Sequence, residues 1–238
     1  MLTRLTAIAL LCIPGVYAHS AEGDHRWYAA VKASLGDVTL SDIETRNIGT
    51  GQLIGGIIDG QLEDDEIDDY TAGLGVAIGK RMGNWAIEGE LVWRYRTDWD
   101  IVTSTPSIET ITNVFSNVET TSLLVNAIRR GSLSRNWSWE VGAGIGVVTN
   151  NVESEYLERA TLTNPQLQFK DDSRHTDFSY NILAGVTRGM SGPGTFNIRY
   201  RYIDLGDLET GPFPTRPGSA SAEQTAHEIQ FSLERDFR

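Results

Sequence analysis

Residues 70–96 read YTAGLGVAIGK-RMGN-WAIEGELVWRYR, and the alternation of side-chain character in this stretch decides the fold. From 70 to 79 every second residue is apolar, and the residues between them are Thr, Ala or Gly. From 85 to 96 Trp, Ile, Leu and Tyr alternate with a face that holds Glu88, Glu90 and Arg94. Because successive side chains of a β-strand point to opposite faces, this period of two predicts two strands, each with one apolar face. The four residues that join them, 81–84, predict an antiparallel hairpin.

The same period recurs in six further segments, whereas helical periodicity is scarce. These segments are 27–35, 120–129, 137–148, 177–188, 195–204 and 226–237. Each is about as long as a tilted strand that crosses a bilayer, roughly 9–11 residues. Aromatic residues near the strand ends are typical of the girdles at a membrane–water interface. They are Trp27, Tyr70, Trp85, Trp93, Tyr95, Trp137, Trp139, Phe178, Tyr180, Tyr200, Tyr202, Phe231 and Phe237.

The connectors between the eight segments alternate strictly in length. Residues 81–84, 130–136 and 189–194 are short connectors, and 36–69, 97–119, 149–176 and 205–225 are long ones. Short turns on one rim and long loops on the other are typical of outer-membrane barrels. We therefore predict an all-β fold, an eight-stranded antiparallel up-and-down transmembrane β-barrel with short periplasmic turns and four long extracellular loops. The alternative is a soluble barrel, in which the apolar faces would pack inward and the charged faces would meet water.

The composition excludes several other classes of protein. With 32 acidic and 20 basic residues the formal charge is −12, which disfavours nucleic-acid binding because that function needs a basic surface. The single cysteine, Cys12, excludes a disulfide framework and a thiolate metal site. The acidic residues also cluster: 24 of the 32 fall in four segments that contain the long connectors, at 37–69, 97–119, 150–177 and 204–224. One rim is therefore expected to be acidic and the other basic.

Residues 1–18 have the three parts of a secretory signal peptide. Arg4 supplies a basic start, residues 5–13 form an apolar run, and Val16-Tyr17-Ala18 matches a small-residue cleavage pattern. The apolar run is too short to span a bilayer. We expect a signal peptide at 1–18 and an outer-membrane β-barrel domain at 19–238.

The polar faces of the strands carry ten charged residues that a closed barrel would turn inward. Hydrocarbon offers the backbone no hydrogen-bond partner, so strands cross a membrane only as a closed barrel, and eight strands leave an interior that side chains can fill. Buried charges persist when they are paired, and glycines on the inward faces would make room for them. We therefore predict an ion-pair plug of five bases and five acids. Its residues are Lys32, Glu88, Glu90, Arg94, Arg96, Glu140, Arg199, Arg201, Glu228 and Glu234.

Four stretches resemble the small outer-membrane barrels of the OmpA-like and opacity-porin (surface antigen) class. They are LLVNA at 123–127, VGAGIGV at 141–147, NIRYRYIDLG at 197–206 and HEIQFSL at 227–233. The resemblance covers nearly all of the mature chain and implies an outer-membrane location in a Gram-negative bacterium. It also implies that Phe231, Leu233 and Phe237 form a C-terminal assembly signal for the barrel-assembly machinery.

Two local clusters of polar residues are candidate sites. The acidic run 63–69 offers oxygen ligands for Ca²⁺ or Mg²⁺, but it lacks the spacing of a calcium-binding loop and is better interpreted as a solvated loop. His175, Asp177 and Ser179 share one face of an extended strand, the only compact grouping that could support hydrolysis of a lipid or ester. A polar strand end is the simpler interpretation, so we predict no catalytic residues, no metal and no cofactor.

The sequence favours a non-enzymatic barrel that acts through its surface loops, in surface contact or adhesion, or in envelope integrity. A small porin-like channel for small solutes is the alternative, and an outer-membrane lipid or ester hydrolase ranks third. The expected partners are outer-membrane lipid and lipopolysaccharide, the barrel-assembly machinery and a host or surface ligand at the loops, with no nucleic acid. The sequence alone does not identify that ligand, because recognition depends on loop shape.

Overall fold

The computed structural model describes residues 25–46, 61–62, 66–105, 110–160, 166–190, 194–211 and 218–237. Within these ranges the chain forms nine strands. The strands are β1 (His25–Arg46), β2 (Gln61–Leu62), β3 (Ile67–Met82), β4 (Trp85–Thr105), β5 (Thr110–Ser132), β6 (Trp137–Ala160), β7 (Gln166–Gly189), β8 (Gly194–Thr210) and β9 (Ser219–Phe237). No helix that could cross a membrane is found among the described residues. The signal peptide predicted at 1–18 lies outside them.

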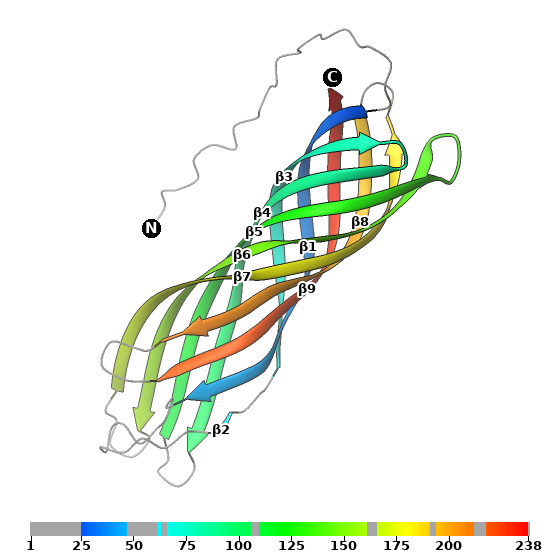
Figure 1. The fold of residues 1–238 in the computed structure, drawn as a ribbon. Coiled ribbons are helices and arrows are strands. Elements are labelled where there is room, and N and C mark those ends of the chain that lie inside the picture. The colour runs from blue at the N-terminus through cyan, green and yellow to red at the C-terminus, as the bar shows by residue number, and fades with distance from the viewer. Residues whose placement is uncertain are drawn as a thin grey trace.

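Eight of the strands close into one antiparallel ring (Figure 1). β1 pairs with β3 on one side and with β9 on the other, which joins the first strand to the last. β4 pairs with both β3 and β5, and each later strand pairs with the next along the chain. The two-residue β2 lies outside the ring and pairs with β4. The predicted eight-stranded antiparallel barrel is confirmed.

The half of the barrel nearest the short turns has its apolar residues on the outside. Leu35, Ile87 and Val125 are each at least 50 % exposed, whereas Lys32 and Glu88 are buried inside. This is the reverse of a soluble barrel, so the soluble alternative is wrong for this half. An apolar outer wall requires an apolar solvent, and a closed ring satisfies the backbone groups that such a solvent cannot.

The strands extend far beyond the bounds that the sequence predicts. β1 reaches Arg46, β4 reaches Thr105, and β5 and β6 pair as far as Thr110 and Ala160. Most of the described residues in the predicted long loops are therefore strand. The alternation continues through them, but its polarity is reversed: Val38 and Leu40 point inward and are buried.

In this second half the barrel separates into two four-stranded sheets. Beyond Asn181 and Ile203, no described residues of β7 and β8 pair through the backbone, and beyond Gly73 and Arg94 the same holds for β3 and β4. One sheet consists of β4, β5, β6 and β7, and the other of β8, β9, β1 and β3. Figure 1 shows the two groups of strands facing each other at the end opposite the short turns.

Side chains of β7 join the two sheets along the first seam. A carboxylate oxygen of Asp177 accepts the backbone N–H of Asp207 at 3.1 Å. The hydroxyl of Ser173 donates to the backbone carbonyl of Glu209 at 2.7 Å. These bonds replace the missing ladder and satisfy part of the open edge of β8.

The second seam is closed in the same way by side chains of β3. A carboxylate oxygen of Asp69 accepts the backbone N–H of Asp98 at 2.8 Å. The hydroxyl of Thr71 donates to the backbone carbonyl of Tyr95 at 3.1 Å. In both seams, therefore, one carboxylate and one hydroxyl of the edge strand bond to the backbone of the strand across the seam.

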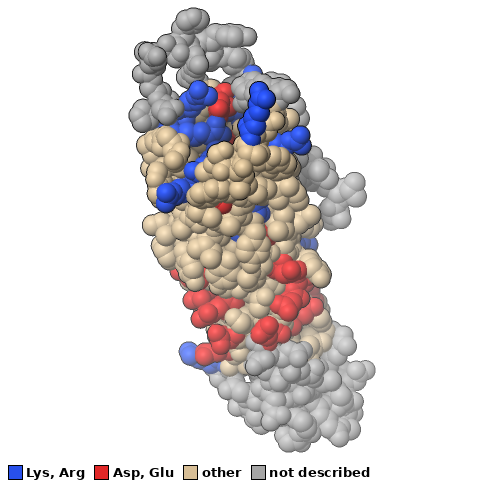
Figure 2. Space-filling model, turned by 90° about the vertical axis from the view of Figure 1, so that its right-hand side faces the viewer, with Lys and Arg blue, Asp and Glu red and all other residues tan. Residues whose placement is uncertain are grey.

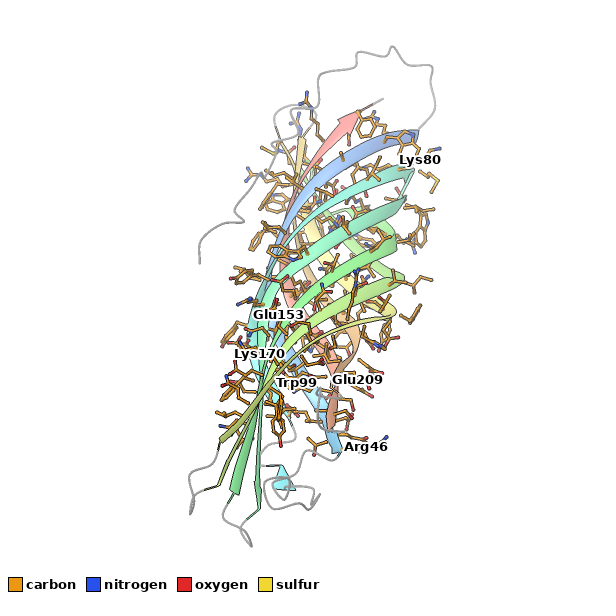
Figure 3. The ribbon with its side chains drawn as sticks, turned by 90° about the vertical axis from the view of Figure 1, so that its left-hand side faces the viewer. Arg46, Lys80, Trp99, Glu153, Lys170 and Glu209 are labelled. Atoms are coloured by element: carbon orange, nitrogen blue, oxygen red, sulfur yellow. The ribbon has the colours of Figure 1, made fainter. Side chains whose placement is uncertain are left out.

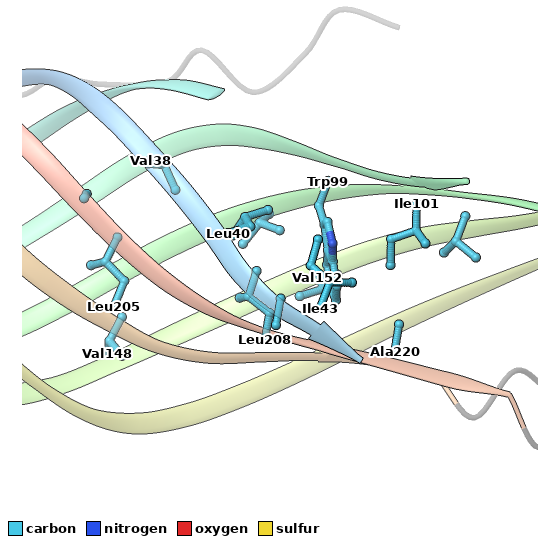
Figure 4. Close-up of a cluster of buried hydrophobic side chains, with 14 of the residues drawn as sticks. Val38, Leu40, Ile43, Trp99, Ile101, Val148, Val152, Leu205, Leu208 and Ala220 are labelled. Carbon is cyan, nitrogen blue, oxygen red and sulfur yellow. The ribbon is translucent and has the colours of Figure 1, made fainter. Parts of the chain in front are cut away.

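The two sheets enclose a continuous apolar core (Figure 4). Trp99 of β4 is completely buried, and its ring lies between the two sheets close to Ile43 of β1 and Val152 of β6. The sheet of β8 and β9 adds Leu205, Leu208 and a row of alanines, and Ile67 and Phe169 pack at the edges. This half of the molecule is built like a soluble β-sandwich, with side chains of both inner faces forming the core.

Candidate functional site

The interior of the first half holds a network of buried ion pairs. The Lys32 ammonium lies 2.6 Å from a carboxylate oxygen of Glu88 and also pairs with Glu90. The Arg201 guanidinium joins Glu90 to Glu228, to which its Nε donates at 2.9 Å. All of these groups are at most 4 % exposed. Each carboxylate is thus shared between cations from different strands.

Arg94 and Arg199 continue the network towards its two ends. Nε of Arg94 lies 2.6 Å from Glu228. The Arg199 guanidinium contacts three carboxylates: Glu88 at 3.1 Å, Glu234 at 3.0 Å and Glu140 through Nε. The ion pairs therefore form one connected chain along the barrel interior.

Two arginines at the short-turn rim complete the network. Arg130 lies 3.1 Å from Glu140 and 2.9 Å from Glu234, and Arg81 pairs with Glu234 and Asp236. In the sequence both arginines fall in short connectors, outside the predicted strands, so they are not among the ten charges expected inside the barrel. The alternation could have identified them, because Arg81 and Arg130 are the next inward positions just beyond the predicted ends of their strands.

Arg96 is the exception among the ten predicted interior charges. Its side chain is 43 % exposed and lies 3.6 Å from Glu153 on the outer surface. A β-bulge is the cause: Arg94 pairs with Thr120 and Thr97 with Val118, so β4 has one extra residue at this point. The bulge turns Arg96 outward and gives the next inward position to Thr97, so the prediction for Arg96 was wrong.

Neutral side chains add further hydrogen bonds to the network. The Tyr28 hydroxyl donates to Glu88 at 2.8 Å, and Nη1 of Arg94 donates to Ser122 at 2.9 Å. Asn126 and Gln230 both donate to Glu90, at 3.3 and 3.2 Å. Such bonds matter because a buried charge without enough partners is costly.

Inward glycines provide the space for two of these neutral side chains. A Cβ added to Gly79 would lie 2.3 Å from the Tyr28 ring. A Cβ added to Gly144 would lie 1.9 Å from Oδ1 of Asn126. The two positions thus accept only glycine if Tyr28 and Asn126 are to keep their places.

The outer surface changes character along the barrel (Figure 2). A band with few charged side chains lies between a rim with basic side chains and a lower region where acidic side chains gather. In the acidic region the pKa of Asp100 is raised, first because the carboxyl is partly buried and next because Asp98 and Asp69 repel its charged form. The predicted charge difference between the two rims is therefore present on the surface.

The other candidate residues of the sequence analysis take structural positions. Asp177 and Ser179 contact the backbone of β8, where Ser179 donates to the carbonyl of Asp204. The hydroxyl of Ser179 is therefore not directed at His175. In the described part of the acidic run, Asp69 accepts backbone N–H groups and Asp68 accepts the Thr39 hydroxyl at 2.8 Å. No group of three or more His, Cys, Asp or Glu side chains among the described residues could hold a metal ion.

A hollow of about 310 Å³ lies at the far end of the second half. Its lining is polar and comes from the ends of β1, β8 and β9. The lining residues are Glu44, Thr45, Arg46, Glu209, Ser219, Ala220 and Ser221. Figure 3 shows Arg46 and Glu209 at this end, whereas Lys80 lies at the short-turn end. Phe231, Leu233 and Phe237 are exposed on the outer face of β9, and their role in assembly stays a prediction.

Comparisons with known proteins agree with this architecture. A family model described as "Outer membrane protein beta-barrel domain" matches residues 5–237. No curated protein matches the chain. The structure is similar to neisserial surface protein A (NspA), with a TM-score of 0.51 and 11% identity over 89% of this chain and 97% of that one.

Two further solved structures have lower scores. Ail, the attachment invasion locus protein of Yersinia pestis, in complex with the heparin analogue sucrose octasulfate, gives a TM-score of 0.45 and 8% identity over 89% of this chain and 99% of that one. OprG from Pseudomonas aeruginosa gives 0.48 and 13% over 88% of this chain and 96% of that one. At such low identity, the likeness to NspA concerns the fold alone.

Proposed function

Because this chain belongs to the family of outer-membrane β-barrel proteins, we propose that it is a non-enzymatic surface protein that acts through the half of its barrel outside the membrane. The protein lies in the outer membrane of a Gram-negative bacterium. In this proposal its short turns lie in the periplasm and its acidic half lies outside the cell, as is usual for such barrels. From here on, the half nearest the short turns, which holds the ion-pair network, is called the membrane half. The half that holds the apolar core around Trp99 is called the extracellular half.

The continuation of the strands into a packed extracellular half is the observation that carries this proposal. Trp99, Leu208 and their neighbours form a core that has no role in crossing the membrane. A packed core of this kind fixes the positions of the strand ends, and so supports the connectors that meet the surroundings. Surface contact is the role to which such a support is suited.

The ion-pair network argues against a channel. Arg199, Arg201 and Glu90 lie across the interior of the membrane half, at most 1 % exposed and joined to several strands. Moving an ion through this region would require breaking several buried pairs at once, each of which is costly to separate. We therefore expect no stable conductance from the purified protein in a planar bilayer.

A hydrolase is disfavoured by the bonds of Ser179. Its hydroxyl donates to a backbone carbonyl, and Asp177 accepts a backbone N–H across the seam. A nucleophilic serine needs a base within hydrogen-bond reach of its hydroxyl. Purified protein is accordingly expected to leave lipid A and ester substrates unchanged.

The polar hollow at the tip is the best-defined contact site of the extracellular half. Glu44 and Glu209 line it together with Arg46, on a half whose outer surface is acidic. Because the surrounding surface would repel polyanions, a cationic or uncharged surface ligand fits this site better than an acidic one.

An adhesion assay tests the proposal. Bacteria expressing the native chain should be retained on cultured epithelial cells, or on one another, more than bacteria with an empty vector. A Glu44→Gln, Glu209→Gln variant should lose most of this gain. A Glu153→Gln, Asp172→Asn variant, with the same change of charge on the other sheet, should keep it.

Each other outcome identifies a different role. If native and empty-vector cells adhere equally but differ in detergent sensitivity, the protein acts in envelope integrity instead. Conductance steps or hydrolysis by the purified protein would contradict the proposal and support the channel or the hydrolase.

A further inference from the structure

Four cations point outward at the periplasmic rim, one from every second strand. They are Lys80 of β3, Arg129 of β5, Arg188 of β7 and Arg235 of β9. Each occupies an outward position of its strand, level with the ends of the apolar outer wall. We call these four residues the basic collar.

Three of the four cations lie over a tryptophan on the neighbouring strand. Lys80 lies 5.5 Å from the ring centre of Trp27, and Arg129 lies 5.8 Å from that of Trp85. Arg188 lies 5.5 Å from the ring centre of Trp137. In each case the two residues are directly paired across the strands, which repeats one arrangement around the barrel.

The collar cations have no carboxylate partner within ion-pair distance among the described residues. This distinguishes them from Arg81 and Arg130, which lie on the same rim but point inward and pair with Glu234. The nearby Asp236 is paired with Arg81. The collar therefore has a positive charge that the described part of the protein does not neutralise.

The tryptophans fix the depth at which this charge lies. Trp27, Trp85 and Trp137 are between 39 % and 51 % exposed on the outer wall. Indole rings at the end of an apolar wall lie at the level of lipid headgroups, since one part of the ring is apolar and the N–H is polar. A guanidinium or ammonium held over such a ring is therefore beside the headgroup phosphates.

We propose that the basic collar binds the phosphates of anionic phospholipids, such as phosphatidylglycerol, in the periplasmic leaflet. The guanidiniums of Arg129 and Arg188 can each donate two hydrogen bonds to one phosphate, and Lys80 adds a point charge. The tryptophan beneath each of these three cations restricts its motion and contacts the glycerol region of the lipid. This inference uses the orientation of the barrel in the membrane and is independent of the surface role proposed above.

The extracellular side of the protein has the opposite charge. Acidic side chains gather there just beyond the apolar band, whereas most of the basic side chains on this face lie at the other end (Figure 2). An anionic lipid is attracted to one rim and repelled by the other. The collar thus also favours a single orientation of the barrel relative to the two leaflets.

Lipid selectivity can be measured with spin-labelled phospholipids. The purified chain is reconstituted in phosphatidylcholine vesicles, and its association with spin-labelled phosphatidylglycerol is compared with that of spin-labelled phosphatidylcholine. A preference of about threefold or more for phosphatidylglycerol is expected, in line with the attraction of several basic residues to an anionic lipid. In the Lys80→Gln, Arg129→Gln, Arg188→Gln variant, phosphatidylglycerol and phosphatidylcholine should associate with the protein almost equally.

Two control variants separate collar binding from general charge. Arg46→Gln, Lys170→Gln, Arg174→Gln removes the same three charges from the extracellular half and should keep the native preference. Arg129→Lys, Arg188→Lys keeps the charge but removes the guanidiniums, so it should keep only part of the preference. Heat-modified mobility on a gel verifies that each variant is folded.

The proposal has clear contrary outcomes. A native chain without preference for phosphatidylglycerol would overturn it. So would a preference that survives in the triple collar variant, or one that is lost equally in the extracellular control.

Discussion

The two halves of this barrel use the same alternation of side chains with opposite faces. In the membrane half, Leu35 and Ile87 face outward and Lys32 and Glu88 face inward. In the extracellular half, Val38 is buried inside and acidic side chains cover the outside (Figure 2). Alternation with a period of two predicts that a segment is a strand, but the solvent on each side of the strand decides which face becomes the interior.

The interiors of the two halves are stable for different physical reasons. The extracellular core gains free energy from removing apolar surface from water. The lumen of the membrane half gains less in this way, because most of its long side chains are charged or polar, although a small cluster, Tyr28, Ala86, Ile128 and Leu183, buries apolar surface there. Its charges must instead satisfy one another, and the loss of one partner leaves another charge buried without compensation.

The largest expected effect comes from breaking the lumen network at its most connected member. Arg199→Met leaves Glu88, Glu140 and Glu234 with fewer cations, because Arg199 contacts all three. We expect the free energy of unfolding to fall by about 3–5 kcal/mol. Urea unfolding of the protein in lipid vesicles, followed by tryptophan fluorescence, measures it.

The control for this prediction removes an exposed cation. Lys170→Met should change the free energy of unfolding by less than about 0.5 kcal/mol, as is usual at the surface. A loss below about 1 kcal/mol in Arg199→Met would mean that water, rather than the arginine, stabilises these carboxylates.

The next effect tests the core of the extracellular half. Trp99 is completely buried, so Trp99→Ala should lower the free energy of unfolding by about 3 kcal/mol. Its indole N–H has no hydrogen-bond partner among the described residues, so Trp99→Phe loses no bond seen there and should cost less than about 1.5 kcal/mol. The same urea titration measures both.

The contrast between the halves makes this test more specific. The difference in gel mobility between boiled and unboiled samples shows whether the membrane half is folded. If the two interiors are energetically separate, the Trp99→Ala variant should keep this difference. If Trp99→Ala lowers the free energy of unfolding and also abolishes the mobility difference, the two halves unfold as one cooperative unit.

The sequence predicts the membrane half well because its rule is simple and local. Nine of the ten expected inward charges, Glu88 and Arg199 among them, are buried in the barrel interior. Arg96 departs from the rule because one extra residue in β4 shifts the alternation. A bulge leaves no clear mark in the sequence, so this error could not be avoided from periodicity alone.

The extracellular half was harder to predict, because its outward acids resemble those of a solvated loop. Asp98 and Asp100 flank the buried Trp99, and the same alternation was interpreted as part of a long connector. The seams also could not be predicted, since the side chains of Asp177 and Asp69 replace backbone pairs only in three dimensions. These features depend on contacts between segments far apart in the chain.

A smaller effect is expected at the seam between β7 and β8. Asp177→Ala removes the acceptor of the Asp207 N–H, and should lower stability by about 1 kcal/mol. The effect should be local, so hydrogen exchange at the Asp207 amide should accelerate while amides of the membrane half are unchanged. Asp172→Ala, on the exposed side of the same strand, is the matched control. Uniform acceleration in all strands would show that the seam is not a separate weak point.

The smallest effect is the pH dependence of Asp100 on the extracellular surface. Partial burial, followed by repulsion from Asp98 and Asp69, raises the pKa of Asp100, so the folded state binds its proton more tightly than the unfolded state. Stability therefore falls as the pH rises from the ordinary pKa of an aspartate through the raised value. Asp100→Asn removes this loss and should be more stable than the native chain at pH 7, by less than about 0.5 kcal/mol, with the difference disappearing in acid.

A second substitution makes the Asp100 test independent of other titrating groups. In an Asp98→Asn background the nearest repelling charge is absent, so the gain from Asp100→Asn at pH 7 should become smaller. Urea unfolding of the four chains at neutral and acidic pH gives the coupling between the two carboxylates. An undiminished gain in that background would show that Asp98 contributes nothing to the raised pKa, which would then come from burial and from Asp69.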